Sequence, residues 1–244
     1  MSFTTGGGLG NQVIRAMALN EVAKKFDLEA SYENHEQIQE RLGIQLFSGS
    51  KAFKQTRYVY NNDLFYLLDQ ALCIDYNVSM SRDFFQTEKM TDLYFKRLTH
   101  KNQKQTIINH NPFKERYDNN NDIYIHVRLQ DLSKWTPDIQ YYIKAIEQVR
   151  NYDTIYLSTD DEEHELIQNL RKCYPCLKLI DKDIIETVQF ASTCKHVILT
   201  FGTFSSLIGW ISYFSTVYYS TVYRPYGAGP IGLFTNKGWN PISI

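Results

Sequence analysis

Short apolar runs and longer amphipathic stretches alternate regularly through the second half of the chain. Continuous apolar runs predict buried strands over residues 123–127, 154–157, 177–180, 196–199 and 216–219. Helices are predicted between them, beginning near residues 136, 158, 184 and 203, the first with Thr136 as N-cap and Pro137 at N1. Repeated strand–helix units form a parallel, doubly wound sheet, so an α/β fold is expected.

The first 32 residues predict another strand–helix–strand unit, with a glycine-rich loop inside it. Strands are expected over 2–5 and 28–32, and the helix between them starts after Asn11 as N-cap. The loop reads GGGLGNQ over residues 6–12. Four glycines in five residues exceed the needs of a turn, so we expect a ligand to approach the backbone closely there.

Two known nucleotide-binding motifs do not fit this loop. A glycine-rich turn without a bound ligand is the alternative interpretation. The dinucleotide motif G-x-G-x-x-G requires a third glycine, but Asn11 or Val13 stands at that position. A Walker A loop requires G-K-[ST], which does not follow. The loop therefore predicts neither an NAD enzyme nor a P-loop enzyme.

The region between the two patterns is less regular. It predicts helices over residues 36–42 and 84–99, and a buried helix or strand–helix mixture over 62–72. A polar, turn-forming run follows at 117–122. We place a domain boundary there, which gives domains 1–117 and 118–244.

Composition excludes several classes of protein. The chain has 244 residues, with 26 basic and 27 acidic side chains and a net charge of −1, so nucleic acid is not expected as a partner. No apolar run reaches the ~18–20 residues of a membrane span, and the N-terminus does not read as a signal peptide, so a cytoplasmic protein is expected. Cys173 and Cys176 form a C-x-x-C without a second ligand pair, so ordinary thiols are favoured over a metal or redox site.

Polar clusters follow three of the predicted strands in the second half. His126 and Arg128 end the first, Ser158 to Asp161 end the second, and the segment 200–206 ends the fourth. The carboxyl ends of parallel strands lie at one edge of the sheet, where ligands of such folds bind. His126 and Arg128 point to the same side because a strand alternates its faces.

This combination of side chains suits a nucleoside diphosphate. Arg128 offers a planar fork for phosphate, while Thr203 to Ser206 offer hydroxyl and N–H groups at a helix N-terminus. Phe204 could stack on a base, and Asp160 or Asp161 could accept a hydrogen bond from a base edge or a ribose.

Two alternatives stay open from the residues alone. Arg128 could pair with Asp131 and cap a loop. The acidic run Asp160-Asp161-Glu162-Glu163 could hold a divalent metal, or could serve only as favourable charges in the first turn of a helix.

Five segments in chain order resemble motifs of inverting fucosyltransferases of the α-1,2 type, shared with α-1,6- and protein O-fucosyltransferases. Residues 7–12 resemble G-G-L-G-N-Q, and residues 126–131 resemble H-x-R-R-x-D. Residues 137–146 are similar to the helix with Y-Y-x-x-A-I, and 157–161 to F-S-D-D with one residue inserted or shifted. Residues 201–210 resemble S-N-S-T-F-S-W-W.

The resemblance implies a GT-B-like fold in a compact version: two facing, Rossmann-like, doubly wound domains, the first on the acceptor side and the second binding the nucleotide sugar. It implies transfer of a sugar, L-fucose from GDP-fucose, to a glycan hydroxyl with inversion. It implies no cofactor and no essential metal.

The resemblance also assigns roles to residues. Arg128 would hold the β-phosphate, Asn11 would face the donor from the first domain, and Asp131 is the candidate base by position. The other residues implied to bind the donor come from the glycine loop and the three strand ends: Gly8, Gly10, His126, Ser158, Asp160, Asp161, Thr203, Phe204 and Ser205.

One departure affects the choice of donor. Leu129 stands where the family has its second arginine. This leaves GDP-rhamnose, GDP-mannose and UDP-xylose as alternative donors, and leaves open a protein that binds a nucleotide sugar without turnover. A length of 244 residues is also short for this family, so trimmed acceptor-binding elements are expected.

Overall fold

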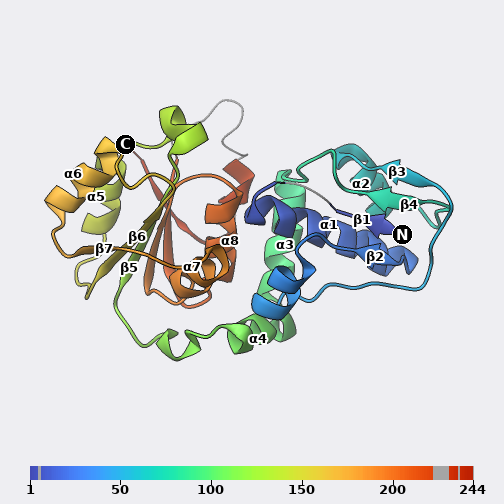
Figure 1. The fold of residues 1–244 in the computed structure, drawn as a ribbon, viewed down its shortest axis with the longest axis horizontal. Helices are drawn as coiled ribbons and strands as arrows, with labels where there is room; N and C mark the ends of the chain where they lie inside the picture. The colour runs from blue at the N-terminus through green and yellow to red at the C-terminus, as the bar shows by residue number, and fades with distance from the viewer. Residues whose placement is uncertain (5–6, 222–230, 236, 244) are drawn as a thin grey trace. The chain divides into compact units, whose positions relative to one another are not determined.

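The chain forms two compact units, residues 1–110 and 111–244, in a computed structural model that describes residues 1–4, 7–221, 231–235 and 237–243 (Figure 1). Each unit contains its own sheet, and the strands of both sheets pair in parallel. The predicted α/β class with two parallel sheets is confirmed. The division falls between His110 and Asn111, whereas the sequence pattern places it at 117–118. Each unit is described by itself below.

The first unit has a four-stranded parallel sheet with the order β2-β1-β4-β3. Its strands are β1 (Ser2–Phe3), β2 (Ala30–Ser31), β3 (Thr56–Tyr58) and β4 (Asn77–Ser79). Its helices are α1 (Leu9–Phe26), α2 (Asn61–Asp69), α3 (Glu88–Thr99) and α4 (Lys101–His110), with a π-helical segment at Glu36–Arg41. Strands β3 and β4 and helix α4 were not foreseen, since β3 and β4 have three residues each and α4 has a mostly polar sequence.

Helix α1 is the central helix of this unit and packs against β1, β2, α2 and α3. It starts at Leu9 with Gly8 as N-cap, so the prediction of Asn11 as N-cap is wrong. It ends at Phe26, and Asp27 follows in the left-handed region with φ +56°. The predicted buried helix or strand–helix mixture over 62–72 is only partly right: α2 ends at Asp69, and Leu64 and Leu67 are buried, but Leu72 is 97% exposed.

The second unit has a six-stranded parallel sheet with the order β10-β9-β8-β5-β6-β7. Its strands are β5 (Ile123–Val127), β6 (Ile155–Thr159), β7 (Leu177–Leu179), β8 (His196–Leu199), β9 (Thr216–Ser220) and β10 (Asn240–Ile242). Numbered within the unit, this order is 3-2-1-4-5-6, the arrangement of dinucleotide-binding Rossmann domains. Helices α5 and α6 cover one face of the sheet and α7 and α8 the other (Figure 1): α5 (Ile139–Glu147), α6 (Glu165–Cys173), α7 (Ile184–Ala191) and α8 (Thr203–Ile211).

The predicted strands 123–127 and 196–199 are confirmed residue for residue, but three other details are wrong. Helix α5 starts at Ile139 and its N-cap is Asp138, whose Oδ1 accepts the Gln140 N–H at 2.8 Å, so Thr136 is not the cap. Helix α6 starts at Glu165, because residues 158 and 159 still belong to β6. Strand β10 follows the strand that was predicted to be the last.

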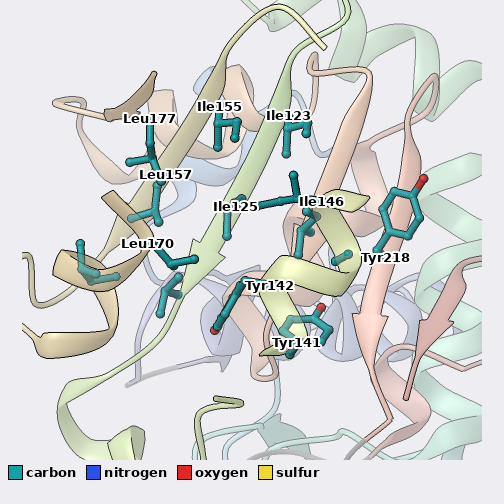
Figure 2. Close-up of a cluster of buried hydrophobic side chains, with 14 of the residues drawn as sticks. Ile123, Ile125, Tyr141, Tyr142, Ile146, Ile155, Leu157, Leu170, Leu177 and Tyr218 are labelled. Carbon is teal, nitrogen blue, oxygen red and sulfur yellow. The ribbon is translucent and has the colours of Figure 1, made fainter. Parts of the chain in front are cut away.

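One hydrophobic core cluster of the second unit lies between the sheet and helices α5 and α6 (Figure 2). Alternate β5 residues Ile123, Ile125 and Val127 point into it and are fully buried. Tyr124 and His126 lie on the opposite face of the sheet, because side chains alternate along a strand. Leu129 continues the alternation beyond the strand and is also fully buried in this core.

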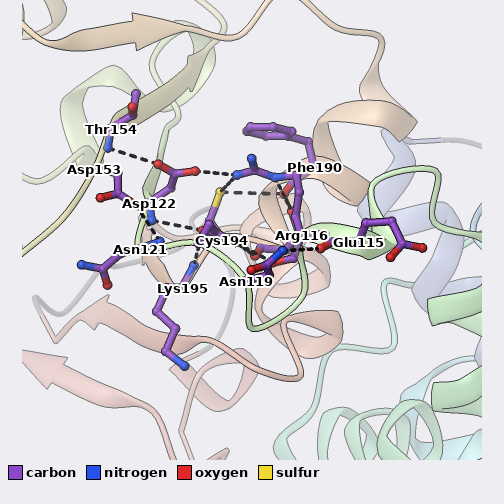
Figure 3. A network of polar contacts seen from close by, with 12 residues as sticks. Glu115, Arg116, Asn119, Asn121, Asp122, Asp153, Thr154, Phe190, Cys194 and Lys195 are labelled. Carbon is purple, nitrogen blue, oxygen red and sulfur yellow. Dashed lines mark hydrogen bonds and ion pairs between the residues drawn. The ribbon is translucent and has the colours of Figure 1, made fainter.

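A polar network holds the segment before β5 against the start of β8 (Figure 3). Asp122, 5% exposed, accepts the Arg116 guanidinium at 2.6 Å and the Thr154 N–H at 3.1 Å. Asn120 donates to the carbonyl oxygens of Arg116 and Thr193, at 2.7 and 2.9 Å. The polar run predicted as a boundary is therefore bonded into the second unit.

No helix in the described part of the chain is long and apolar enough to cross a membrane.

Candidate functional site

The switch point of the second sheet lies between β5 and β8. From β5 the chain continues outward through β6 and β7, then returns to β8 on the other side of β5 and proceeds to β9 and β10. In such sheets, ligands bind beyond the carboxyl ends of the strands where this reversal occurs. His126 lies at that end, paired in register with Leu199 of β8 and Ser158 of β6. The three polar clusters therefore follow neighbouring strands.

His126 joins the end of β5 to the start of α8. Its side chain is buried, and its Nδ1 shares a hydrogen bond of 2.6 Å with Oγ of Ser205, which is fully buried. The Thr200 hydroxyl lies 3.4 Å from the same Oγ and donates to the His126 carbonyl at 3.2 Å. These bonds hold the first turn of α8 in a fixed position beside β5.

The imidazole of His126 is neutral in this environment. Burial, with a smaller contribution from the positive charge of Arg128, lowers the pKa of His126 to about 3. The Phe204 ring lies 5.0 Å from the imidazole, centre to centre, at an interplanar angle of 58°. His126 therefore supplies hydrogen-bonding groups to the site without a second positive charge.

The N-terminus of α8 is suited to an anion. Gly202 is the N-cap with φ +98°, a conformation that favours glycine, and a Cβ added there would meet no atom within 4 Å. The hydroxyl of Ser206 turns back to the Gly202 carbonyl at 2.9 Å. The helix has nine residues and no acidic side chain in its first turn. Its first N–H groups and its dipole both favour negative charge.

Arg128 is held by Asp160 and stays partly accessible. Its Nη1 lies 2.9 Å from Asp160 Oδ2, and the two side chains are 38% and 18% exposed. The other oxygen, Asp160 Oδ1, accepts the Leu129 N–H at 2.7 Å, and the Thr136 hydroxyl donates to the Arg128 carbonyl. Asp160, which follows β6, therefore contacts both the Arg128 side chain and the backbone after β5. The side chain of Asp131, named above as a partner of Arg128 and as a base, lies outside the described part of the structure.

The remaining residues of the second cluster have different surroundings. The Ser158 hydroxyl lies 2.5 Å from the hydroxyl of Tyr124, a buried residue of β5. The Asp161 N–H donates to Thr159 Oγ1 at 3.2 Å, and its half-buried carboxylate follows the ion-paired Asp160. Among the described residues, no three His, Cys, Asp or Glu side chains gather closely enough to hold a metal ion.

The glycine loop belongs to the first unit, where it follows β1. Gly7 has φ +90°, and a Cβ there would lie 3.0 Å from Cβ of Asn11, so a larger residue would strain the turn. A Cβ on Gly8 would meet no atom within 4 Å, which leaves its backbone open to a ligand. Asn11 Oδ1 accepts from Gln86 at 2.9 Å, and Gly10 is buried within α1.

No family model matches the sequence, and no curated protein matches it. Among solved structures, the chain is similar to NodZ α-1,6-fucosyltransferase soaked with GDP-fucose, with 15% identity, 62% of this chain and 57% of that chain covered, and a TM-score of 0.39. A second structure of NodZ, from Bradyrhizobium, gives 15% identity, coverage of 61% and 56%, and a TM-score of 0.38. The chain therefore spans little more than half the length of NodZ.

Two further similarities cover more of the chain. A variant of Arabidopsis thaliana FUT1 in complex with GDP has 11% identity over 93% of this chain and 71% of its own, with a TM-score of 0.47. The E. coli heptosyltransferase WaaC with a fluorinated ADP-heptose has 11% identity over 99% and 91%, with a TM-score of 0.48. All these TM-scores are below 0.5, so the proposals below rest on the residues of this chain.

Sequence patterns located the strand ends but missed two features of this site. From sequence, Asp160 or Asp161 was expected to bind the nucleobase edge or the ribose. The ion pair between Asp160 and Arg128 was not foreseen, because 32 residues separate the two positions. The sequence patterns also did not single out Gly202, although a glycine between an apolar strand and a helix is a signal for an open helix N-terminus.

Proposed function

We propose that this protein is a glycosyltransferase of the GT-B type that binds a nucleotide sugar at the carboxyl edge of its second sheet. The observation that carries the proposal is one constellation at the switch point: Arg128 held by Asp160, next to the neutral His126 and the open N-terminus of α8. The order of the five fucosyltransferase-like motifs supports the same assignment.

In the proposed reaction, the diphosphate of the donor occupies the space between Arg128 and the first turn of α8. The sugar leaves the β-phosphate as an acceptor hydroxyl attacks the anomeric carbon from the opposite side, which inverts that carbon. Negative charge grows on the leaving nucleotide, where the guanidinium and the N–H groups after Gly202 stabilise it. This provides charge stabilisation from protein groups and requires no metal ion.

The other residues take supporting roles in this proposal. Asp160 keeps the Arg128 fork oriented, His126 fixes α8 through Ser205, and Phe204 stacks on the base. The Asp161 carboxylate binds the ribose or base edge. In the first unit, we assign the glycine loop with Gly8, Gly10 and Asn11 to ligand binding, and Asp131 is the candidate base.

GDP-fucose is the donor we favour, on the strength of the motif resemblance. Titration calorimetry with GDP, UDP and ADP tests this, and we expect GDP to bind most tightly. A clear preference for UDP or ADP contradicts the assignment of a GDP-sugar, while the diphosphate site itself would stand.

The role of Arg128 has a direct test with a matched control. Lysine keeps the charge of Arg128 but cannot form a bidentate pair, so Arg128→Lys should lower GDP affinity by about tenfold or more while the fold survives. Arg171→Lys, at an exposed position of α6, should change nothing. Equal GDP affinity in wild type and Arg128→Lys contradicts the phosphate role.

The second candidate function is binding of a nucleotide sugar without turnover. The burial of Leu129 favours it. The residue that replaces the family's second arginine is buried in the core, so one positive charge of the family pattern does not reach the donor from this position. Release of GDP from GDP-fucose, measured with and without glycan acceptors, separates the two. Saturable binding with no GDP release under any condition supports the binding protein.

A further inference from the structure

Three exposed aromatic side chains lie at or just after the ends of neighbouring strands in the first unit. Tyr58 ends β3, Tyr60 follows two residues later, and Phe84 follows β4; they are 47%, 44% and 53% exposed. Strands β3 and β4 pair in parallel, so these residues lie at one edge of the sheet. Large exposed aromatics grouped in this way mark an interaction surface more often than single ones do.

A built polar framework holds these side chains. The Asp83 carboxylate accepts the backbone and side-chain N–H groups of Asn61, both at 2.9 Å, and the Phe84 N–H at 2.6 Å. The Arg82 guanidinium lies 3.7 Å from the Tyr58 ring centre and is oriented by that ring. The segments after β3 and β4 are therefore joined, and Arg82 is oriented before any ligand arrives.

The backbone next to Phe84 is strained. Phe85 is fully buried and has φ +53°, an outlier for a bulky residue. Such strain is kept where the surrounding structure enforces it, commonly at binding sites. Here the buried Phe85 anchors the turn while Phe84 is directed outward.

The same edge carries the glycine loop. Strand β1, which leads into the loop, pairs with β4. Arg15 of α1 donates to the Asp83 carbonyl at 2.9 Å, and its guanidinium lies 5.1 Å from the Phe84 ring centre. Gln86 binds Asn11 of the loop at 2.9 Å. The aromatic surface and the loop thus form one continuous edge within the first unit.

We propose that Tyr60, Arg82 and Phe84 form a carbohydrate-binding platform that takes the acceptor glycan. Aromatic rings pack against the apolar face of a pyranose, and a preoriented guanidinium donates to its hydroxyl groups. The charges of Glu33 and Asp83 offset that of Arg15, so the surface suits a polar neutral ligand better than a polyanion. The acceptor role rests on the proposed function, but the binding of a sugar does not.

The test is binding of a panel of methyl glycosides of galactose, glucose, mannose, xylose, rhamnose and fucose, measured by saturation-transfer NMR. We expect at least one to bind the wild type, and Phe84→Ala and Tyr60→Ala to weaken it about tenfold, which equals about 1.4 kcal/mol. Phe84→Tyr keeps the ring and should bind normally. Tyr66→Ala removes a tyrosine that is 57% exposed on α2 and should have no effect. GDP affinity, measured in parallel, should be the same in all variants.

Each outcome either supports or contradicts the proposed carbohydrate-binding platform. If no glycoside binds the wild type, or if Phe84→Ala and Tyr66→Ala behave alike, the platform is wrong, whatever GDP does. If glycosides bind through Phe84 but GDP does not bind, the proposed donor site is wrong and the platform stands. A concentration-dependent dimer that Phe84→Ala abolishes, in a protein that binds no glycoside, reassigns the surface to a second copy of the chain and overturns the proposal.

Discussion

Replacing Leu129 by arginine tests whether position 129 belongs to the core or to the proposed donor site. The leucine side chain is fully buried, in the cluster that α5 and α6 cover. Its backbone N–H is bonded to Asp160 at 2.7 Å, and it continues the side-chain alternation of β5. Arg128 and residue 129 therefore point to opposite sides, and a second arginine at 129 would be directed into the apolar core.

The expected cost follows from this burial. Removing a fully buried leucine forfeits about 1.5–3 kcal/mol of hydrophobic transfer. A guanidinium forced into the same space is unpaired, and its desolvation costs several kcal/mol more, less whatever it recovers by reaching water. We expect Leu129→Arg to lower the free energy of unfolding by about 3–5 kcal/mol, a large part of the ~5–15 kcal/mol of an ordinary domain.

The assay can report on the second unit alone. All three tryptophans of the chain, Trp135, Trp210 and Trp239, lie in that unit, so urea denaturation followed by tryptophan fluorescence measures its unfolding. Leu129→Met conserves volume and should cost less than about 1.5 kcal/mol. Gln130→Arg places the same charge one residue further at an exposed position and should cost about 1 kcal/mol or less.

One result would refute the reasoning. If Leu129→Arg unfolds within about 1 kcal/mol of the wild type and binds GDP more tightly, then residue 129 reaches the donor. Leu129 would in that case be a change of specificity at the site, and the direction assigned to its side chain would be wrong.

Two further predictions concern stability. His126 has a folded pKa of about 3, below the 6.5 of an exposed histidine, so the unfolded state binds its proton first; stability should be intact above pH 6.5 and fall towards pH 3, by at most about 1.4 kcal/mol per pH unit. Urea midpoints from pH 7 to pH 4 measure this, and His126→Gln should flatten the profile; an unchanged slope contradicts the assignment. Asp122→Ala leaves the Arg116 guanidinium without its carboxylate and should cost about 3–5 kcal/mol. Asp118→Asn, which breaks the more exposed pair with Lys195 and tolerates the positive φ of this position, should cost under about 1 kcal/mol, and similar losses in both variants would sink the distinction.

Local signals predicted strands better than helix starts in this chain. Strands β5 and β8 were placed residue for residue because they are mostly apolar and are followed by polar side chains. The start of α5 was misplaced because Thr136, Pro137 and Asp138 are all favourable near a helix N-terminus. The choice depends on a contact outside the helix. The Thr136 hydroxyl donates to the Arg128 carbonyl, so the Asp138 carboxylate caps the helix instead.

For the proposed donor site, too, local features were predictable from the sequence and contacts between distant residues were not. The polar clusters after β5, β6 and β8 were visible as interruptions of apolar runs. Their convergence followed from the parallel winding. Which side chains meet there was not visible, since Arg128 pairs with Asp160 and His126 with Ser205 across separations that no local period encodes.

The amino-acid sequence by itself determined the α/β class, the parallel winding of the second unit and the strand ends that carry its polar residues. It did so because burial of a strand or a helix leaves a period in the chain that needs no knowledge of the neighbours. Only the tertiary structure decided the strand order with β5 beside β8, the pairing of Arg128 with Asp160, the burial of Leu129 and the aromatic edge of the first unit. Those depend on contacts between segments far apart in the chain, whose energies appear only when the sheet is assembled.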